Sequence, residues 1–148
     1  MNSPVAIASD HAGFSLKEQI RTLLEQRGIP YVDFGTSSED RVDYPDYAVA
    51  GANAVGSGAY ACGILVCGSG IGMSIVANKV SGVRAAECLT VEAATLARQH
   101  NDANVLTLGQ RLIDGPTAEA IVCAFLDTPF EGGRHQQRVD KIHSLTGR

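Results

Sequence analysis

The sequence predicts an α/β protein, a Rossmann-like three-layer sandwich built on a five-stranded parallel sheet. Short apolar runs rich in Val, Ile and Leu alternate along the chain with longer segments of helical periodicity. This alternation is typical of a parallel sheet that helices cover on both faces. A composition of 45% hydrophobic and 19% charged residues, with 16 glycines, is that of a globular chain. Right-handed crossovers are expected between successive strands.

The first half of the chain contains two expected pairs of a strand and a helix. An apolar run predicts a strand over 5–9, and the helical pattern over 15–27 ends at Gly28, because glycine commonly follows the last turn of a helix. A second apolar run, 29–34, predicts a second strand. The polar segment after it predicts a loop, and 47–55 predicts the next helix.

The second half repeats this alternation. Ile64, Leu65 and Val66 form a short branched run of the kind that suits a strand covered on both faces, and this strand is expected to end at Cys67. Thr90 is expected to cap a helix, because its hydroxyl can accept from a first-turn amide. The other expected elements are strands at 83–86 and 105–108 and helices at 71–80, 90–100 and 115–126.

We expect one domain over 1–148, because this is about the length of a single domain. The Rossmann-like core is expected to span 1–128, and the tail over 129–148 is expected to end in a helix. The apolar stripe of that helix consists of Val139, Ile142 and Leu145. The tail helix either docks on its own domain or reaches a partner subunit across a two-fold axis, and we favour the partner.

Charge and cysteine usage exclude several functional classes. The net charge of −4 argues against nucleic acid or an anionic membrane as the main partner, because proteins that bind these carry a basic surface. No apolar run approaches a bilayer-spanning length and the N-terminus has no signal-peptide pattern, so we expect a cytoplasmic protein. The 4 cysteines show neither a CxxC pair nor zinc-finger spacing, which argues against disulfide and metal sites.

The segment ILVCGSGIGMSIVANK, residues 64–79, joins a buried strand to a helix through a thiol and a glycine-rich turn. Gly68, Gly70 and Gly72 let the backbone approach a ligand, and the helix that begins near Ile71 directs unpaired N–H groups at the turn. A thiol at a helix N-terminus ionises more readily than a free thiol, and a thiolate acts as a base or nucleophile. An active site is one interpretation; a buried structural cysteine is the other.

Polar residues follow three of the expected strands at their carboxyl ends. Asp10 and His11 follow the first strand, Cys67 ends the third, and the turn over 109–111 follows the fifth. Because ligands bind beyond the carboxyl ends of parallel strands, we expect these residues to converge at one edge of the sheet. Asp10 has an alternative role as a cap of the first helix.

The tail helix offers candidates for phosphate binding. Arg134 and Arg138 are four residues apart, so they project from one face and are suited to bind one phosphate together, with Arg111 as a third candidate. The alternative is a solvated helix face on which these arginines pair with acids such as Asp140.

His100 is a candidate general acid. It closes an expected helix, where the negative end of the helix dipole favours a protonated imidazole. The alternative is a histidine that caps the helix, with Asn101 at the C′ position.

A dinucleotide-binding domain is the competing functional class. GSGIG after a strand is similar to the dinucleotide fingerprint, and Glu87 ends the next strand, where an acid would bind ribose. The spacing argues against this class, because the glycines form GxGxG rather than GxGxxG and Met73 stands where the third glycine should be.

Five ordered segments carry a family resemblance that covers essentially the whole chain. They are DHAG at 10–13, DYPDYA at 43–48, CGSGIGMSIVANK at 67–79, RQHNDANVLTLGQR at 98–111 and EGGRHQQRV at 131–139. Together they resemble the type B ribose-5-phosphate isomerase family, which also includes isomerases of allose 6-phosphate and galactose 6-phosphate. The resemblance implies a Rossmann-like homodimer, in some members a dimer of dimers, with active sites at the subunit interface and no metal or organic cofactor.

The resemblance also implies catalytic roles. Cys67, assisted by Ser69, would be the base that moves a proton between C1 and C2 of the open-chain sugar through a cis-enediolate. His100 would open the sugar ring, with His135 in reserve, because some members use a histidine of the tail motif. One branch of the family uses a glutamate where this chain has Met73, so the chain resembles the cysteine branch.

Substrate-binding roles follow from the same resemblance. The amides of the glycine-rich turn would bind the enediolate, and Asp10 and Asn101 would hold sugar hydroxyls. Tyr44 would line the ring-opening end. The implied amide donors are Gly68, Ser69, Gly70, Ile71 and Gly72, and the implied phosphate ligands are His11, Arg111, Arg134 and Arg138.

The expected substrate is ribose 5-phosphate, converted to ribulose 5-phosphate. The galactose 6-phosphate enzymes of the family divide their site between two different chains, whereas all motif residues are present in this one, which favours a homomer. A hexose 6-phosphate, allose or galactose 6-phosphate, is the alternative substrate. A regulator that binds sugar phosphate or nucleotide without turnover is a further alternative.

Overall fold

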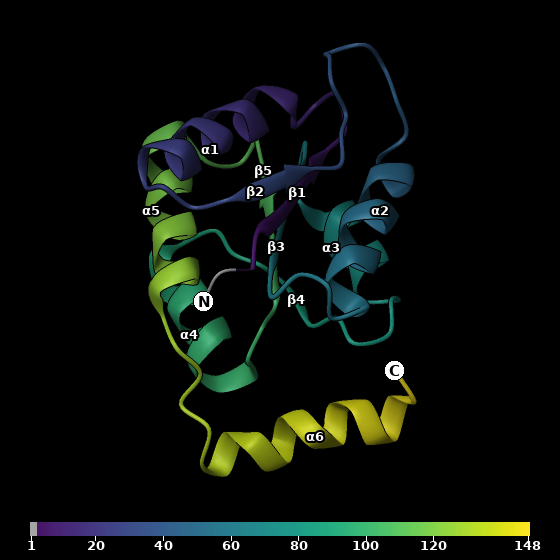
Figure 1. The fold of residues 1–148 in the computed structure, drawn as a ribbon, viewed down its shortest axis with the longest axis vertical. Helices are drawn as coiled ribbons and strands as arrows, with labels where there is room; N and C mark the ends of the chain where they lie inside the picture. The colour runs from purple at the N-terminus through teal and green to yellow at the C-terminus, as the bar shows by residue number, and fades with distance from the viewer. Residues whose placement is uncertain (1–2) are drawn as a thin grey trace.

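The computed structural model describes residues 3–148 and contains a five-stranded, all-parallel sheet in the order β2-β1-β3-β5-β4 (Figure 1). The predicted fold class is therefore confirmed. The strands are β1 (Val5–Ser9), β2 (Tyr31–Asp33), β3 (Gly63–Cys67), β4 (Ala85–Glu87) and β5 (Val105–Gly109). The helices are α1 (Phe14–Gln26), α2 (Tyr44–Gly56), α3 (Ile71–Ala77), α4 (Val91–Asn101), α5 (Gly115–Asp127) and α6 (Arg134–Thr146).

Helices cover both faces of the sheet, as the apolar character of the central strands predicts. Every residue of β1, β3 and β5 is buried, because α1, α4 and α5 pack on one face and α2 and α3 on the other (Figure 1). Alternate strand residues therefore enter two separate apolar clusters: Ile64 and Val66 face the first group of helices, and Leu65 and Cys67 face the second. The thiol of Cys67 thus points to the side of the glycine-rich turn and α3.

Several element boundaries differ from prediction for local reasons. The predicted start of α2 at residue 47 is wrong, because Tyr44 already begins the helix and a proline is tolerated in the first turn. The helix after the glycine-rich turn ends at Ala77 rather than near residue 80. There the Asn78 side chain binds both backbone groups of Ala85, with its Oδ1 accepting from the amide at 2.8 Å and its Nδ2 donating to the carbonyl at 3.0 Å.

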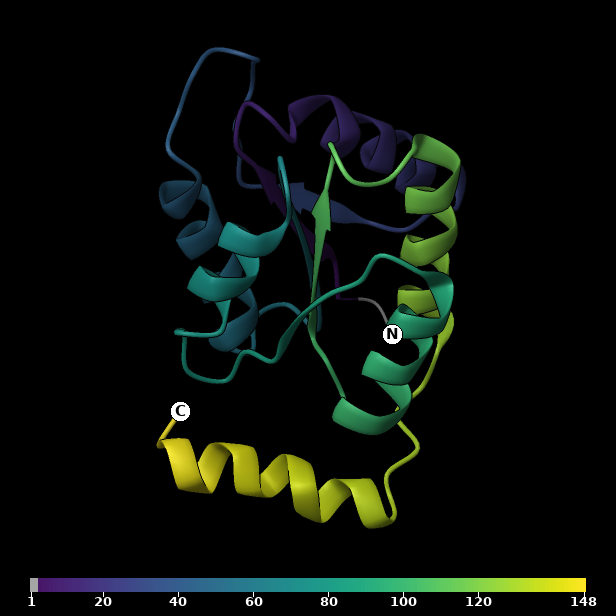
Figure 2. The same cartoon turned by 180° about the vertical axis from the view of Figure 1, so that it is seen from behind.

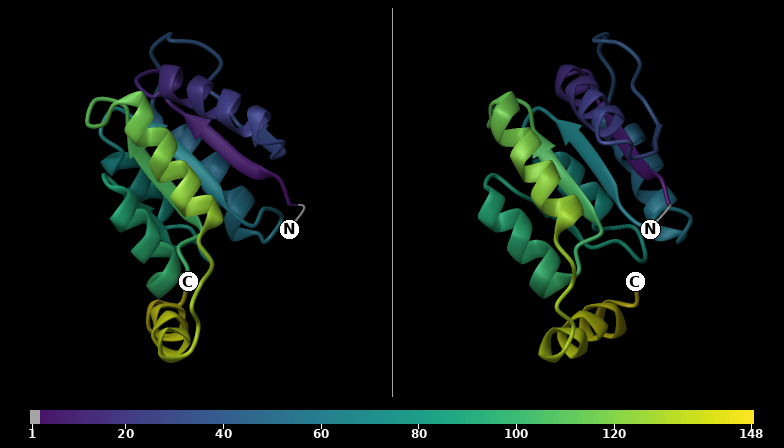
Figure 3. Two further views of the ribbon diagram at one scale, coloured as in Figure 1. Left: turned by 90° about the vertical axis from the view of Figure 1, so that its left-hand side faces the viewer. Right: turned by 60° about the vertical axis from the view of Figure 1, so that its left-hand side comes forward.

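The last helix lies across the end of the domain where the strands begin, opposite their carboxyl ends (Figures 2 and 3). Val139 is buried against the domain, whereas Ile142 is 41% exposed and Leu145 is 82% exposed. Only the first part of the predicted apolar stripe is therefore covered within one chain, and contact with a partner subunit stays a prediction. Within residues 3–148, no helix is both long enough and apolar enough to cross a bilayer.

Candidate active site

A cavity of about 600 Å³ lies beyond the carboxyl ends of β1, β3 and β5. The strand order reverses between β1 and β3, because β2 lies on one side of β1 and β3 on the other. Parallel sheets bind ligands at such a point. The predicted convergence of Asp10, His11, Cys67 and Arg111 on one edge is confirmed, because all four line this cavity. The complete lining is Asp10, His11, Ala12, Arg41, Tyr44, Cys67, Gly68, Ser69, Ile71, Gly72, Ile75, Arg111 and Leu112.

The glycine-rich turn holds the Cys67 thiol against backbone amides. Cys67 ends β3 and is only 4% exposed, and the Gly70 N–H donates to its Sγ at 3.1 Å. Gly70 has φ +77°, a left-handed conformation that glycine adopts without strain, and the helix begins at the next residue. The Ile71 amide donates to the Ser69 hydroxyl oxygen at 3.3 Å. The turn therefore places the thiol and the Ser69 hydroxyl at one wall of the cavity, each accepting a hydrogen bond from an amide of the turn.

Two side chains pack directly on the glycines of this turn. A Cβ at Gly68 would lie 3.1 Å from the Arg111 Nη1, and a Cβ at Gly72 would lie 2.6 Å from the ring of Tyr44. The guanidinium and the phenol therefore flank the turn closely. A larger residue at Gly72 would collide with the ring of Tyr44, and one at Gly68 would require Arg111 to shift by a few tenths of an ångström.

Asp10 and His11 are fixed by hydrogen bonds that leave part of each side chain for a ligand. The buried Asp10 accepts from the Gly13 amide at 2.9 Å through Oδ1. His11 Nδ1 lies 3.1 Å from the Val42 carbonyl oxygen and 3.2 Å from the Val42 nitrogen. Because Nδ1 is engaged with the loop before α2, Nε2 is the ring atom left for a ligand.

The other predicted site residues lie at the opposite end of the molecule. α4 returns against the strand direction, so its end lies near the beginning of the strands, as does α6 (Figure 2). His100 and Asn101 are the last residues of α4, and Arg134 and Arg138 belong to α6. None of these four lines the Cys67 cavity. Within a single chain, the residues around Cys67 and these four residues are therefore at opposite ends of the molecule.

His100 is not followed by the predicted C′ asparagine. Asn101 is the last helical residue, and Asp102 takes the left-handed position with φ 46°. The Asp102 carboxylate accepts from the Arg98 guanidinium at 2.9 Å, which ties the helix end together. Asn101 is exposed, so its amide is free to bind a molecule outside the chain.

His100 stacks on His135, with ring centroids 4.3 Å apart and planes 12° apart. Burial lowers the pKa of His135, and the positive charge of Arg134 acts in the same direction, whereas Glu131 acts in the opposite one. Glu131 Oε2 lies 3.5 Å from His135 Nε2. The three side chains offer ligand atoms within 4.8 Å of one another, but nearly parallel rings do not aim their lone pairs at one point, as a tetrahedral zinc site needs.

The tail arginines, Arg134 and Arg138, are both exposed. In the described part of the chain neither forms an ion pair within 4.0 Å. Asp140, the expected acidic partner, instead accepts from the Gln136 side chain at 2.9 Å. The ion pairs expected in the alternative interpretation are therefore absent among the described residues, but both arginines do lie on a solvated helix face, and their role in phosphate binding stays a prediction.

Sequence reasoning missed four residues that line the cavity: Ala12, Arg41, Ile75 and Leu112. Arg41 lies in the polar segment that was predicted only as a loop. Its one signal in the sequence is its place just before the DYPDYA segment that contains Tyr44. Ile75 is 55% exposed and Leu112 is 52% exposed, and neither showed a pattern that separates a cavity rim from an ordinary surface residue.

Glu87 lies behind the glycine-rich turn rather than at a ribose-binding position. A Cβ at Gly70 would collide with its Oε2, and this buried oxygen has no hydrogen-bond partner among the described residues. Burial raises the pKa of Glu87, because an unpartnered carboxylate is poorly solvated there. The geometry therefore gives no support to the dinucleotide interpretation.

We expect the variant Glu87→Gln to gain stability over the parent protein as the pH rises. An acid with a raised folded-state pKa contributes its stability below its unfolded pKa and loses it as pH rises through the folded value. The glutamine does not titrate, so the gain at pH 8 should exceed the gain at pH 4. Urea unfolding at both pH values measures this difference, and equal gains would contradict a buried, destabilising carboxylate.

Comparison with known proteins adds a consistent result. The family model described as Ribose/Galactose Isomerase matches residues 5–142. Ribose-5-phosphate isomerase B of Escherichia coli is 48% identical over 144 residues, which is 97% of each chain. The structure of ribose-5-phosphate isomerase B from Clostridium thermocellum matches with a TM-score of 0.95 at 46% identity, over 97% of each chain. That of the Mycoplasma genitalium enzyme with bound ribulose-5-phosphate matches with a TM-score of 0.95 at 42% identity, over 100% of this chain and 99% of the other.

Proposed function

This chain belongs to the ribose/galactose isomerase family, and we propose that it interconverts D-ribose 5-phosphate and D-ribulose 5-phosphate. The chain is an isomerase, and the pentose phosphate is the substrate in the names of relatives that match over nearly its full length. One observation of the structure carries the proposal: the thiol of Cys67 lines a cavity and accepts a hydrogen bond from the turn that follows it.

In the proposed mechanism Cys67 is the base. The thiolate removes the proton from C2 of the open-chain aldose, and the electrons form a C1–C2 double bond as O1 takes up the negative charge. The thiol then returns that proton to C1 and the hydroxyl proton moves from O2 to O1, which gives the ketose. Amides of the turn from Gly68 to Gly72 donate to the enediolate oxygens, which carry the developing charge. Ser69 assists the cysteine. General base catalysis of this kind contributes about 10² to 10⁴ in rate.

The second half of the proposed site comes from a partner subunit. His100 would open the furanose ring by proton transfer and Asn101 would hold sugar hydroxyls, yet both lie at the opposite end of their own chain from Cys67. Two copies related by a two-fold axis would bring each far end to the other's cavity. This arrangement needs no change of fold, because each copy presents Cys67 at one end and His100 and Asn101 at the other.

Exposed apolar residues at both ends support such a homodimer. Ile71 and Ile75 on α3, at the cavity rim, are 52% and 55% exposed, and Ile142 and Leu145 on α6 are 41% and 82% exposed. Apolar side chains of this size at a cavity rim are typical of an interface. If the apolar residues of α3 in one copy packed against those of α6 in the other, the exposed part of the α6 apolar stripe would become buried.

Substrate would be held by both chains. Asp10 would hold a sugar hydroxyl and Tyr44 would line the ring-opening end, both from the chain that carries the base. His11 and Arg111 of that chain would bind the phosphate from one side. Arg134 and Arg138 of the partner would bind it from the other, which accounts for two exposed arginines that form no ion pair within residues 3–148.

We expect Arg138→Ala to raise KM for ribose 5-phosphate about tenfold with a small effect on kcat, because a charge-assisted hydrogen bond to phosphate contributes about 1.5 to 3 kcal/mol. Steady-state kinetics measures both constants. Lys141→Ala, which removes an exposed cation from the same helix, is the matched control and should leave KM unchanged. An unchanged KM in Arg138→Ala would return this residue to the solvated surface.

The test of the proposed function is conversion of ribose 5-phosphate to ribulose 5-phosphate by the purified protein in the presence of a chelator. Allose 6-phosphate and galactose 6-phosphate are assayed beside it. Fast conversion of the pentose supports the proposal. Preference for a hexose phosphate would keep the mechanism and change the substrate, and no turnover of any of the three would overturn the isomerase assignment in favour of a binding protein.

A further inference from the structure

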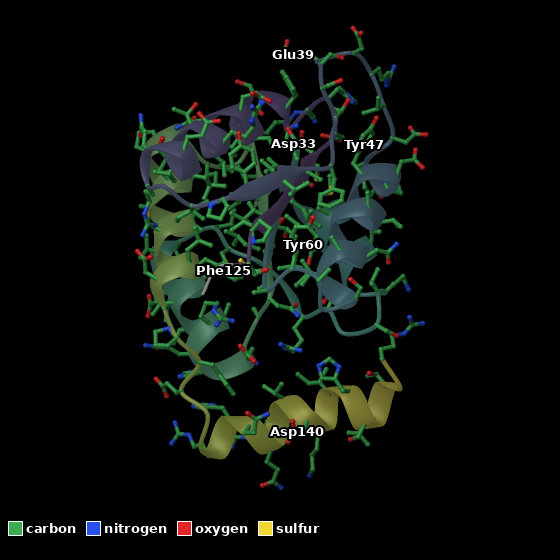
Figure 4. The ribbon with its side chains drawn as sticks, in the orientation of Figure 1. Asp33, Glu39, Tyr47, Tyr60, Phe125 and Asp140 are labelled. Atoms are coloured by element: carbon green, nitrogen blue, oxygen red, sulfur yellow. The ribbon has the colours of Figure 1, made fainter. Side chains whose placement is uncertain are left out.

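Arg41 lines the Cys67 cavity from the loop that precedes α2. This loop, 35–43, projects beyond the carboxyl ends of the strands, with Glu39 near its tip (Figures 1 and 4). Arg41 is exposed, and within residues 3–148 it forms no ion pair shorter than 4.0 Å although Glu39, Asp40 and Asp43 are its neighbours in sequence. A guanidinium that lines a cavity without an acidic partner is available to an anionic ligand.

The loop holds Arg41 near the other cations of the cavity. His11 Nδ1 lies 3.1 Å from the Val42 carbonyl oxygen and 3.2 Å from the Val42 nitrogen, so it bonds one of the two according to its tautomer. The ring of Tyr44 packs on Gly72. The residues just after Arg41 are thus attached to two walls of the cavity. The loop cannot carry Arg41 far away while these contacts persist.

The charged groups of the cavity favour an anion. Its lining contains one carboxylate, Asp10, whose Oδ1 is already engaged by the Gly13 amide. Against this stand the guanidinium groups of Arg41 and Arg111 and the imidazole of His11. Two guanidinium groups beside one carboxylate are notable in a chain with a net charge of −4, and with the imidazole they offer three donors around one space, which suits the several oxygens of a phosphate group.

We infer that Arg41 is a phosphate-binding residue of its own protomer, which acts with His11 and lets the site distinguish a phosphorylated sugar from the free sugar. This inference rests on the proposed function for the identity of the sugar, but its chemistry requires only a phosphate monoester. Arg41 would bind the phosphate from the side of its own protomer, and the tail arginines of the partner subunit would bind it from the other side. Its long side chain on a loop would follow the phosphate without moving Cys67.

The test compares Arg41→Gln with Arg27→Gln, a matched loss of one arginine at an exposed ion pair with Asp127. We expect Arg41→Gln to raise KM for ribose 5-phosphate by about tenfold or more and to leave the inhibition constant of unphosphorylated D-ribose unchanged. Arg27→Gln should match the parent protein in both. Arg41→Lys, which keeps the charge but loses the planar fork, should fall between.

Calorimetric titration with inorganic phosphate separates a failure of this inference from a failure of the proposed function. Orthophosphate should bind the parent protein and Arg27→Gln alike and bind Arg41→Gln at least about tenfold more weakly. Equal affinity in Arg41→Gln, or an unchanged KM, would overturn the role of Arg41. If the parent protein turns over none of the three sugar phosphates, the proposed function fails, and the orthophosphate titration still decides whether Arg41 binds phosphate.

Discussion

Replacement of Cys67 by alanine should reduce kcat for ribose 5-phosphate by about 10² to 10⁴-fold while substrate still binds. The variant lacks the group that removes the C2 proton, but it keeps the amides of the glycine-rich turn and the cations of the cavity. Cys67 is only 4% exposed, and loss of one sulfur atom at the end of β3 disturbs little packing. Steady-state kinetics gives the loss of turnover, and calorimetry with ribose 5-phosphate shows whether binding persists.

Cys88 provides the matched control for Cys67. Burial, with the charge of Glu87 as a second cause, raises the pKa of Cys88 to about 11, so its thiol is protonated at neutral pH. Cys88 is buried to a similar degree, with 2% exposure, but does not line the cavity. Cys88→Ala should retain most of the activity, and near-normal turnover in Cys67→Ala would remove Cys67 as the base.

The sheet and the carboxyl edge could be predicted because they depend on local patterns. Branched apolar runs such as 64–66 form buried strands wherever helices cover them, and residues that follow parallel strands meet at one edge without further information. Boundaries depend on tertiary contacts and were predicted less well. α3 ends where the Asn78 side chain forms two hydrogen bonds with the backbone of Ala85. No local sequence pattern predicts that these two segments come together.

The site was harder to predict than the fold, because only part of it is formed by residues that are adjacent in sequence. The rest depends on tertiary contacts and on oligomeric assembly. Cys67 and its turn were predicted from the residues, since a thiol and glycines adjoin in sequence. Arg41 was missed because an arginine in a polar loop looks like any solvated residue until the loop is attached through His11 and Val42. The position of His100 relative to Cys67 depends on the direction of α4 and on oligomeric assembly, and a single sequence pattern determines neither.

A mixed dimer should show whether one active site uses two chains. In the proposed homodimer each site takes Cys67 from one chain and His100 from the other. We expect a purified heterodimer of a Cys67→Ala chain and a His100→Asn chain to recover about half the activity of the parent dimer, because one of its two sites has both wild-type residues. Each variant alone should be nearly inactive.

The same two substitutions placed in one chain give the matched control. When a double-variant chain pairs with a wild-type chain, every shared site contains one altered residue, so this heterodimer should be nearly inactive. If each chain instead held a complete site, the outcomes would reverse: the double variant with wild type would keep about half the activity and the first heterodimer would have none. Two differently tagged chains, co-expressed and purified through both tags, allow the comparison. Within one chain His100 lies at the opposite end from the Cys67 cavity, so we expect the shared arrangement.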